Sequence, residues 1–147
     1  MPLGKLKPEM KLAVKIACSV LLLFNGIGAV YGGLSLITSP DGSSIGLALK
    51  WLKHSPFHNY LVPGIVLFVC NGLLSFFVFF RLMQNARSYP LLVIAQGVIL
   101  TGWIVIEMVL MKTIHFFHII LGATGVLLFF GGYVLKRLVN KNHNGIK

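Results

Sequence analysis

The chain has 147 residues, of which 56% are hydrophobic and only 11% are charged, and its formal net charge is +10. A mean hydropathy of +0.87 is typical of a membrane protein and excludes an ordinary soluble domain. The Lys and Arg residues lie outside long apolar runs and form no basic stripe with interleaved aromatic residues, so nucleic-acid binding is not indicated. Cys18 and Cys70 fit no metal or dithiol spacing and are predicted to be packing residues.

Four apolar stretches are long enough to cross a bilayer as α-helices, which takes about 20 residues each. They lie at residues 16–37, 62–80, 90–111 and 114–135. Backbone polar groups find no water in hydrocarbon, so each stretch is expected to be helical. The predicted fold is an all-α membrane protein: a single domain over residues 1–147, built as a four-transmembrane-helix bundle.

The distribution of basic residues predicts the orientation of this bundle. The first stretch runs on to Ile37 without a convincing cleavage site, so it is predicted to be an uncleaved span rather than a signal peptide. Basic residues gather in both tails and between spans two and three: Lys5, Lys7, Lys11, Lys15, Arg81, Arg87, Lys136, Arg137, Lys141 and Lys147. Since such residues stay on the cytoplasmic side, both termini are expected in the cytoplasm and the protein in the cell (inner) membrane.

The link between spans one and two is long enough to hold structure of its own. Its sequence SPDGSS predicts a turn, after which apolar residues recur at helical spacing: Ile45, Ala48, Leu49 and Leu52. We expect a short interfacial helix over residues 45–53, lying on the membrane surface with Trp51 among the head groups.

Small and polar residues inside the spans predict how the helices pack. Gly28 and Gly32 form a GxxxG pattern, which favours close packing within the chain or at a dimer face. A polar residue of each span is expected near the middle of the bilayer: Asn25, Asn71, Thr101 and Thr124. These four are predicted to form an interhelical hydrogen-bond cluster, and the alternative is a polar path for a solute.

Glu107 is one of only three acidic residues, and it lies in the third span. It precedes the turn at Lys112 and Thr113 by the same distance by which His118 follows it, so the two side chains should meet at equal depth. His115 lies one turn nearer the surface, and the link between spans one and two adds His58 and Asp41 on the same membrane side. These five residues form the candidate functional cluster.

Three hypotheses remain open for this cluster. The first is a structural pair between Glu107 and His118 that fixes spans three and four. The second is a metal site, for which Glu107, His115 and His118, with His58, supply accepted ligand types at a spacing that is not diagnostic. The third is a protonatable site that couples proton movement or ligand binding to helix packing.

The sequence resembles a family of small, uncharacterised four-span proteins of the bacterial inner membrane. The resemblance covers residues 21–68 and rests on the Gly-rich first span, the SPDG loop, the SPF segment and the YLVPG start of span two. The organisation is also similar to that of DoxX-like proteins, and the span count to that of vitamin K epoxide reductases, whose paired cysteines are absent here. The resemblance implies a four-span membrane protein and carries over no catalytic residue.

The sequence therefore favours a non-enzymatic accessory, scaffold or interaction protein, with no predicted cofactor. Its predicted partners are the lipid bilayer and a second copy of the chain or another membrane protein. The first alternative is a small proton-coupled transporter or sensor that works through Glu107 and His118. A membrane metalloenzyme is the second alternative.

Overall fold

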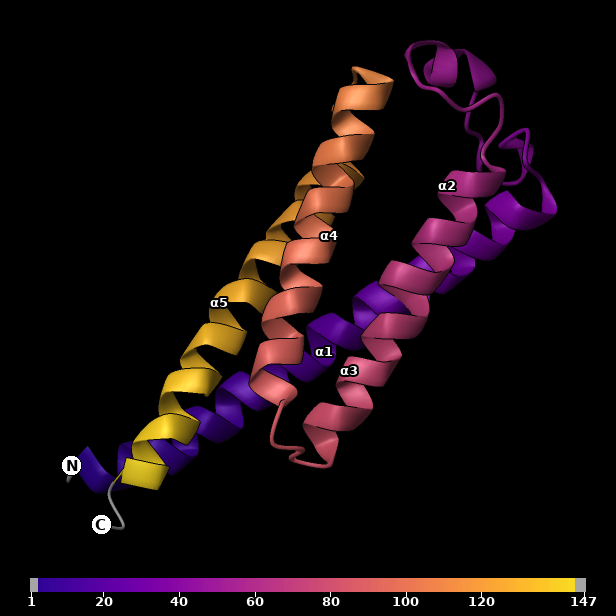
Figure 1. The fold of residues 1–147 in the computed structure, drawn as a ribbon. Helices are drawn as coiled ribbons and strands as arrows, with labels where there is room; N and C mark the ends of the chain where they lie inside the picture. The colour runs from indigo at the N-terminus through magenta and orange to yellow at the C-terminus, as the bar shows by residue number, and fades with distance from the viewer. Residues whose placement is uncertain (1–2, 145–147) are drawn as a thin grey trace.

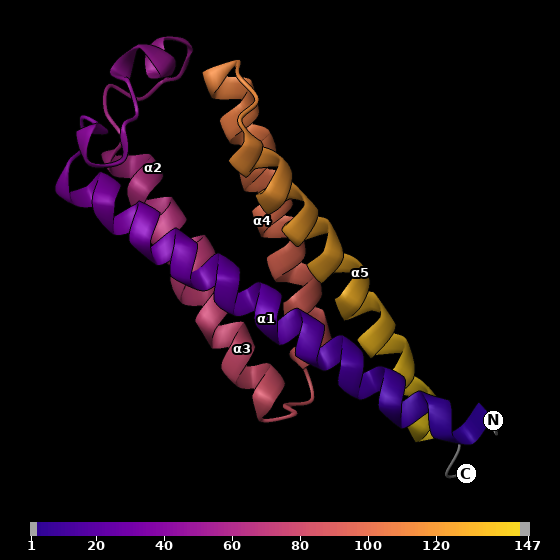
Figure 2. The same cartoon turned by 180° about the vertical axis from the view of Figure 1, so that it is seen from behind.

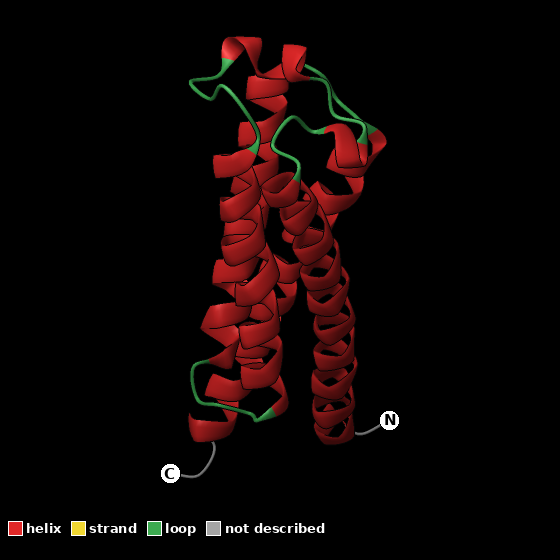
Figure 3. Ribbon diagram, turned by 90° about the vertical axis from the view of Figure 1, so that its right-hand side faces the viewer, coloured by secondary structure: helices red, strands yellow, loops and turns green. Residues whose placement is uncertain are grey.

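The computed structural model describes the backbone of residues 3–144 and the side chains of residues 8–140. The predicted orientation also used Lys5, Lys7, Lys141 and Lys147, whose side chains lie outside the described part. Within that part every regular element is helical (Figure 3). The elements are α1 (Leu3–Thr38), η1 (Ser43–Ile45), η2 (Leu49–His54), α2 (Leu61–Val66), η3 (Leu67–Leu73), α3 (Leu74–Met83), α4 (Tyr89–Met111) and α5 (Phe116–Asn144).

Four helical rods are long and apolar enough to cross a membrane, at Pro8–Thr38, Leu61–Met83, Tyr89–Met111 and Phe116–Asn140. The second rod is continuous through α2, η3 and α3, and its middle segment η3 is a π-helix. These four rods confirm the predicted all-α bundle, and the protein is a multi-pass membrane protein. The first rod begins eight residues before its predicted span, and the other three begin within two residues of their predicted starts.

The rods are arranged as two pairs. Figure 1 shows α4 and α5 side by side along their lengths, and α1 running along α2 and α3 on the other side of the molecule. Seen from behind, α1 lies in front of α3 and reaches α5 near the chain termini (Figure 2). We call the end that holds both termini and the α3–α4 link the termini end. The opposite end, with the links before α2 and α5, is the loop end.

Glycines set the close approach between α4 and α5. A Cβ atom on Gly97 would lie 2.5 Å from the Phe129 nitrogen, and one on Gly125 would overlap the Thr101 side chain. A Cβ atom on Gly132 would lie 2.8 Å from the Ile94 nitrogen. Each of these glycines also approaches backbone atoms of the other helix, which cannot move aside as a flexible side chain can, so the pair depends on these small residues.

A second row of glycines joins α1 to the rod formed by α2 and η3. A Cβ atom on Gly33 would lie 2.7 Å from the Phe68 Cβ, and one on Gly64 would lie 2.7 Å from the Leu36 Cβ. The predicted packing pair contributes less to this contact. Gly32 approaches only the Leu67 side chain, at 3.4 Å, and Gly28 has nothing within 4 Å, so it faces away from the other helices.

The link before α2 differs from the single helix expected at residues 45–53. It contains two short 3₁₀ helices, Ser43–Ile45 and Leu49–His54, separated at Gly46, whose φ of 70° is left-handed. The helical stripe is therefore interrupted after Ile45: Leu52 is buried, whereas Leu49 is exposed. Leu52 instead packs with Leu36 of α1 and with Tyr60 just before α2.

Tyr60 ties this link to the bundle. Its hydroxyl donates to the Ala48 carbonyl oxygen at 2.9 Å, and its backbone N–H donates to the Pro40 carbonyl oxygen at 2.8 Å. Burial raises the pKa of the Tyr60 phenol, so the hydroxyl remains a donor at neutral pH. These two hydrogen bonds hold the link in a folded conformation at the loop end.

The α3–α4 link ends α3 in a Schellman motif. Asn85 adopts φ 51°, its N–H donates to the Leu82 carbonyl oxygen, and the N–H of Ala86 donates to the Arg81 carbonyl oxygen. Asparagine tolerates the left-handed conformation better than most residues, which explains its place here. This turn fixes the position of Arg81 and of the start of α4 at Tyr89.

Candidate functional site

Glu107 is held by a side chain of its own helix. Trp103 lies one turn earlier on α4, and its Nε1–H donates to Glu107 Oε1 at 2.8 Å. Hydrogen bonds to a charged acceptor are stronger than neutral ones, so this contact fixes the orientation of the carboxylate. The side chain of Glu107 remains 22% exposed.

The structure brings His118 of α5 to the other oxygen of the same carboxylate. His118 Nε2 lies 3.6 Å from Glu107 Oε2, and its side chain is only 8% exposed. This distance is longer than a hydrogen bond, so the two groups are in contact without a full bond. The two residues meet because Glu107 precedes the α4–α5 turn by about as many residues as His118 follows it.

A backbone contact defines which nitrogen of His118 carries the proton. The N–H of His115 donates to His118 Nδ1 at 3.0 Å, so Nδ1 acts as an acceptor and is unprotonated. The proton of the neutral ring then sits on Nε2, which faces Glu107. His118 is thus a neutral donor in this arrangement, and the Glu107 carboxylate has no cationic partner in it.

His115 takes a different position from the one expected for a metal ligand. Its exposed ring packs against Trp51 of η2, with centroids 5.3 Å apart, and its Nε2 lies 3.4 Å from the Thr113 hydroxyl. The ring thereby joins the α4–α5 link to the link before α2.

A cavity of about 220 Å³ lies between α2 and α4 at the loop end. Its walls are almost entirely apolar, and Glu107 is the one charged residue among those that line it. The lining comes from α1, the link, α2 and α4: Leu36, Leu47, Leu52, Phe57, Tyr60, Val62, Pro63, Val66, Trp103, Ile106, Glu107, Leu110 and Met111. An apolar pocket with a single convergent polar group is the usual form of a small-molecule site.

The remaining members of the predicted cluster lie apart from this cavity. Asp41 accepts hydrogen bonds from the Ser43 backbone and hydroxyl, at 3.1 and 2.8 Å, which lower the pKa of its carboxyl. His58 is exposed on the link. Within the described side chains, no three His, Cys, Asp or Glu residues are close enough to share a metal ion. The structure therefore assembles Glu107 and His118 and supplies no ligand set for the metal hypothesis.

The mid-membrane polar residues also separate into two groups. Asn25 Nδ2 donates to the Ser75 hydroxyl at 2.8 Å and to the Asn71 carbonyl oxygen at 3.2 Å, linking α1 to η3 and α3. Thr101 and Thr124 instead donate to carbonyl oxygens of their own helices, Gly97 at 2.8 Å and Ile120 at 2.9 Å. The expected cluster over four helices is thus reduced to its α1, η3 and α3 part.

Sequence reasoning did not select Ser75, Gln96 or Trp103. Gln96 is fully buried on α4, and its Nε2 donates to the Cys70 carbonyl oxygen at 3.4 Å across to η3. The side chain of Asn71 is fully buried in the π-helix, and neither its Nδ2 nor its Oδ1 has a hydrogen-bond partner. The sequence pattern that could have identified Gln96 and Trp103 is their helical spacing from Glu107, which places all three on one face of α4.

Comparison of this chain with models of known protein families, with curated proteins and with solved structures found no match. The site must therefore be interpreted from its own geometry, and the resemblance noted from the sequence stays a prediction.

Proposed function

We propose that this membrane protein is a non-enzymatic accessory protein that binds an amphipathic molecule with a cationic head in the Glu107 cavity. One observation supports the proposal above all. The cavity is apolar, its single charged group is a carboxylate, and the two side chains in contact with that carboxylate, the donor Trp103 and the nearby ring of His118, are neutral. No serine or cysteine nucleophile is among the lining residues.

Electrostatics favours a cationic head over a neutral or anionic one. An ionised carboxylate in apolar surroundings loses hydration free energy, which a cation within contact distance restores. No described lysine at the loop end supplies that cation, because among the described residues only His118 is in ion-pair contact with Glu107. A ligand with an ammonium head can satisfy the carboxylate while its alkyl part lies between α2 and α4.

Octylamine and octanol test this proposal, because they share an apolar chain and differ in the charge of the head. The wild-type protein in detergent is expected to bind octylamine at least about tenfold more tightly than octanol, as for other charge-assisted contacts. Glu107→Gln keeps the acceptor to Trp103 and removes the charge, so the preference should disappear. Isothermal titration calorimetry measures both affinities.

Asp41→Asn is the matched control, because Asp41 is an acid at the same end of the molecule and lies outside the cavity lining. This variant should keep the wild-type preference for octylamine. Equal binding of the two compounds by the wild-type protein would contradict the proposal.

We propose the cell (inner) membrane as the location, with both termini in the cytoplasm. Support comes from the described bases at the termini end: Lys11, Lys15, Arg81, Arg87, Lys136 and Arg137. The loop end carries fewer, Lys50, Lys53 and Lys112. The open surface at Gly28 supports the further hypothesis of a contact with a second copy or another membrane protein.

The Glu107 and His118 pair also favours a second candidate function, a proton-responsive sensor. A proton added to His118 Nδ1 would remove the acceptor of the His115 N–H and so release the start of α5. Other titratable or charged groups nearby are His115 itself, Glu107 on α4 and Lys112 in the link.

Hydrogen exchange of the His115 amide tests the sensor function. As the pH falls, this amide is expected to lose protection in the wild-type protein, because imidazolium has no free acceptor nitrogen. In His118→Phe the amide should exchange rapidly at every pH, whereas His58→Phe should behave as the wild type. Protection that is independent of pH would contradict the sensor function and leave ligand binding untouched.

A further inference from the structure

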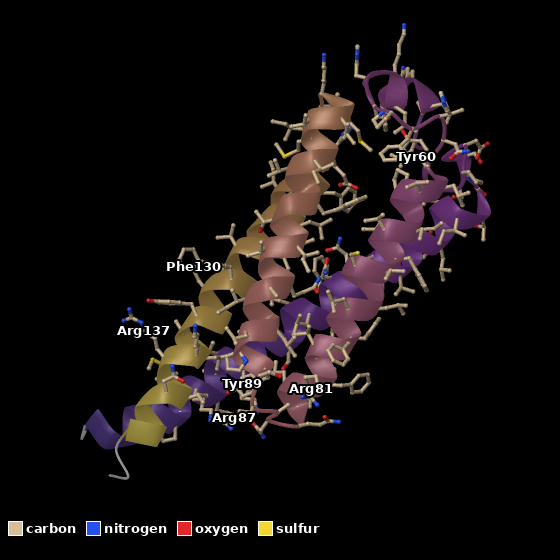
Figure 4. The ribbon with its side chains drawn as sticks, in the orientation of Figure 1. Tyr60, Arg81, Arg87, Tyr89, Phe130 and Arg137 are labelled. Carbon is tan, nitrogen blue, oxygen red and sulfur yellow. The ribbon has the colours of Figure 1, made fainter. Side chains whose placement is uncertain are left out.

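A second polar site lies at the termini end, far from the Glu107 cavity. It is formed by Lys15 of α1, Arg81 of α3, Arg87 of the α3–α4 link and Tyr89 at the start of α4. Figure 4 labels Arg81, Arg87 and Tyr89 together at the end where α3 and α4 are joined. Three helices and a link thus contribute bases and a phenol to this end of the molecule.

Lys15 is fixed against the α3–α4 link. Its Nζ donates to Asn85 Oδ1 at 2.7 Å and lies 5.8 Å from the centroid of the Tyr89 ring. Asn85 is itself held by the Schellman turn, so the ammonium group is positioned by two independent contacts. Lys15 is only half-buried and keeps two of its three N–H donors for another partner.

Two further donors of this site are buried without a partner. The Tyr89 hydroxyl and the Arg81 Nε have no hydrogen-bond acceptor within the described chain, and Tyr89 is only 3% exposed. Buried donors in folded proteins are nearly always satisfied, so both groups need an acceptor that the described chain does not supply. The start of α4 adds the positive end of a 23-residue helix.

Within the described side chains, no carboxylate balances the charge of this site. None of Lys15, Arg81 and Arg87 forms an ion pair with a described carboxylate; the recorded pair, Glu107 with His118, lies at the loop end. Three bases, a phenol donor and a helix start therefore lie at this end of the molecule without a described anion. A phosphate group matches this set, because its oxygens accept several charged hydrogen bonds at once.

We propose that this site binds the phosphate of an anionic membrane lipid. The neighbouring surface favours a lipid over free phosphate: Ile16, next to Lys15, is 56% exposed, and Phe80, next to Arg81, is 58% exposed. These side chains offer the acyl chains of a bound lipid an apolar surface on α1 and α3. Basic groups at a membrane surface attract anionic lipids in general, and the fixed Lys15 and buried Tyr89 hydroxyl add a defined geometry.

The test compares phosphatidylglycerol, phosphatidylcholine and inorganic phosphate, each added to the detergent-purified protein. Native mass spectrometry counts bound lipid, and the unfolding temperature reports stabilisation. Phosphatidylglycerol is expected to remain bound and to raise the unfolding temperature, and the other two should do neither. Arg81→Gln should weaken lipid binding about tenfold, and Tyr89→Phe, which removes only the hydroxyl, about threefold.

Two basic residues outside the site serve as matched controls. Lys136→Gln changes a base on α5 at the same end, and Lys50→Gln changes one at the loop end; both should keep wild-type lipid binding. If Lys136→Gln weakens binding as much as Arg81→Gln, the attraction is general surface charge and the proposed site is wrong. Equal stabilisation by inorganic phosphate would overturn the assignment to a lipid. If Arg81→Gln does not fold, Tyr89→Phe decides, and unchanged lipid binding by it overturns the proposal.

Discussion

Gly97→Ala is expected to destabilise the protein by about 2 to 3 kcal/mol, the cost of forcing an extra methyl group into a packed contact. The added Cβ would lie 2.5 Å from the Phe129 nitrogen and 2.7 Å from the Gly125 carbonyl oxygen. Because both are backbone atoms of α5, the two helices must move apart, and every contact along their shared length weakens. Thermal unfolding in detergent, monitored by circular dichroism, measures the effect.

Gly102→Ala, five residues further along the same helix, provides the control. Its added Cβ has no atom within 4 Å. Alanine favours a helix over glycine by up to about 1 kcal/mol, so this variant should be as stable as the wild type or slightly more so. Equal destabilisation by both substitutions would mean that Gly97 matters for its backbone flexibility and not for the close approach of α5.

Asn71→Leu is expected to stabilise the protein, against the usual effect of changing a buried residue. The side chain of Asn71 is fully buried, and neither of its polar atoms has a hydrogen-bond partner. Leucine branches at the same carbon and carries no polar atom that must lose hydration, so about 1 to 2 kcal/mol should be gained. The unfolding temperature of the purified variant measures this gain.

Asn25→Leu is the matched comparison, since it lies in the same polar group but has two bonds to lose. Its Nδ2 donates to the Ser75 hydroxyl and to the Asn71 carbonyl oxygen. This variant should be destabilised by about 1 kcal/mol, the value typical of such bonds between membrane helices. If Asn71→Leu is destabilised as well, Asn71 has a bonding partner in solution that the described contacts do not include.

A stabilising Asn71→Leu would also bear on function. Residues that cost stability are often retained because they act, and Asn71 lies in the π-helical turn Leu67–Leu73, a feature frequent at functional sites. Such a result would direct the search for activity to the contact between η3 and Gln96 on α4, as well as to the Glu107 cavity.

Several features of the site followed from the sequence because they depend on distance along a helix. The four spans follow from hydropathy and the rise per residue. The meeting of Glu107 and His118 follows from equal counts on either side of the α4–α5 turn, although that turn is longer than predicted, running from Lys112 to His115.

Contacts between helices that are distant in sequence could not be predicted in this way. The cavity forms because α2 and the folded link lie opposite α4. Asn25 bonds to Ser75 because Gly26 and Gly33 let α1 pack closely against the second rod, which places these two side chains side by side. Asn85, Lys15 and Tyr89 gather only because the Schellman turn reverses the chain. The sequence by itself determined the class, the spans and their depth in the bilayer. The tertiary structure alone decided which faces meet, because crossing and register depend on packing between helices, which no local pattern encodes.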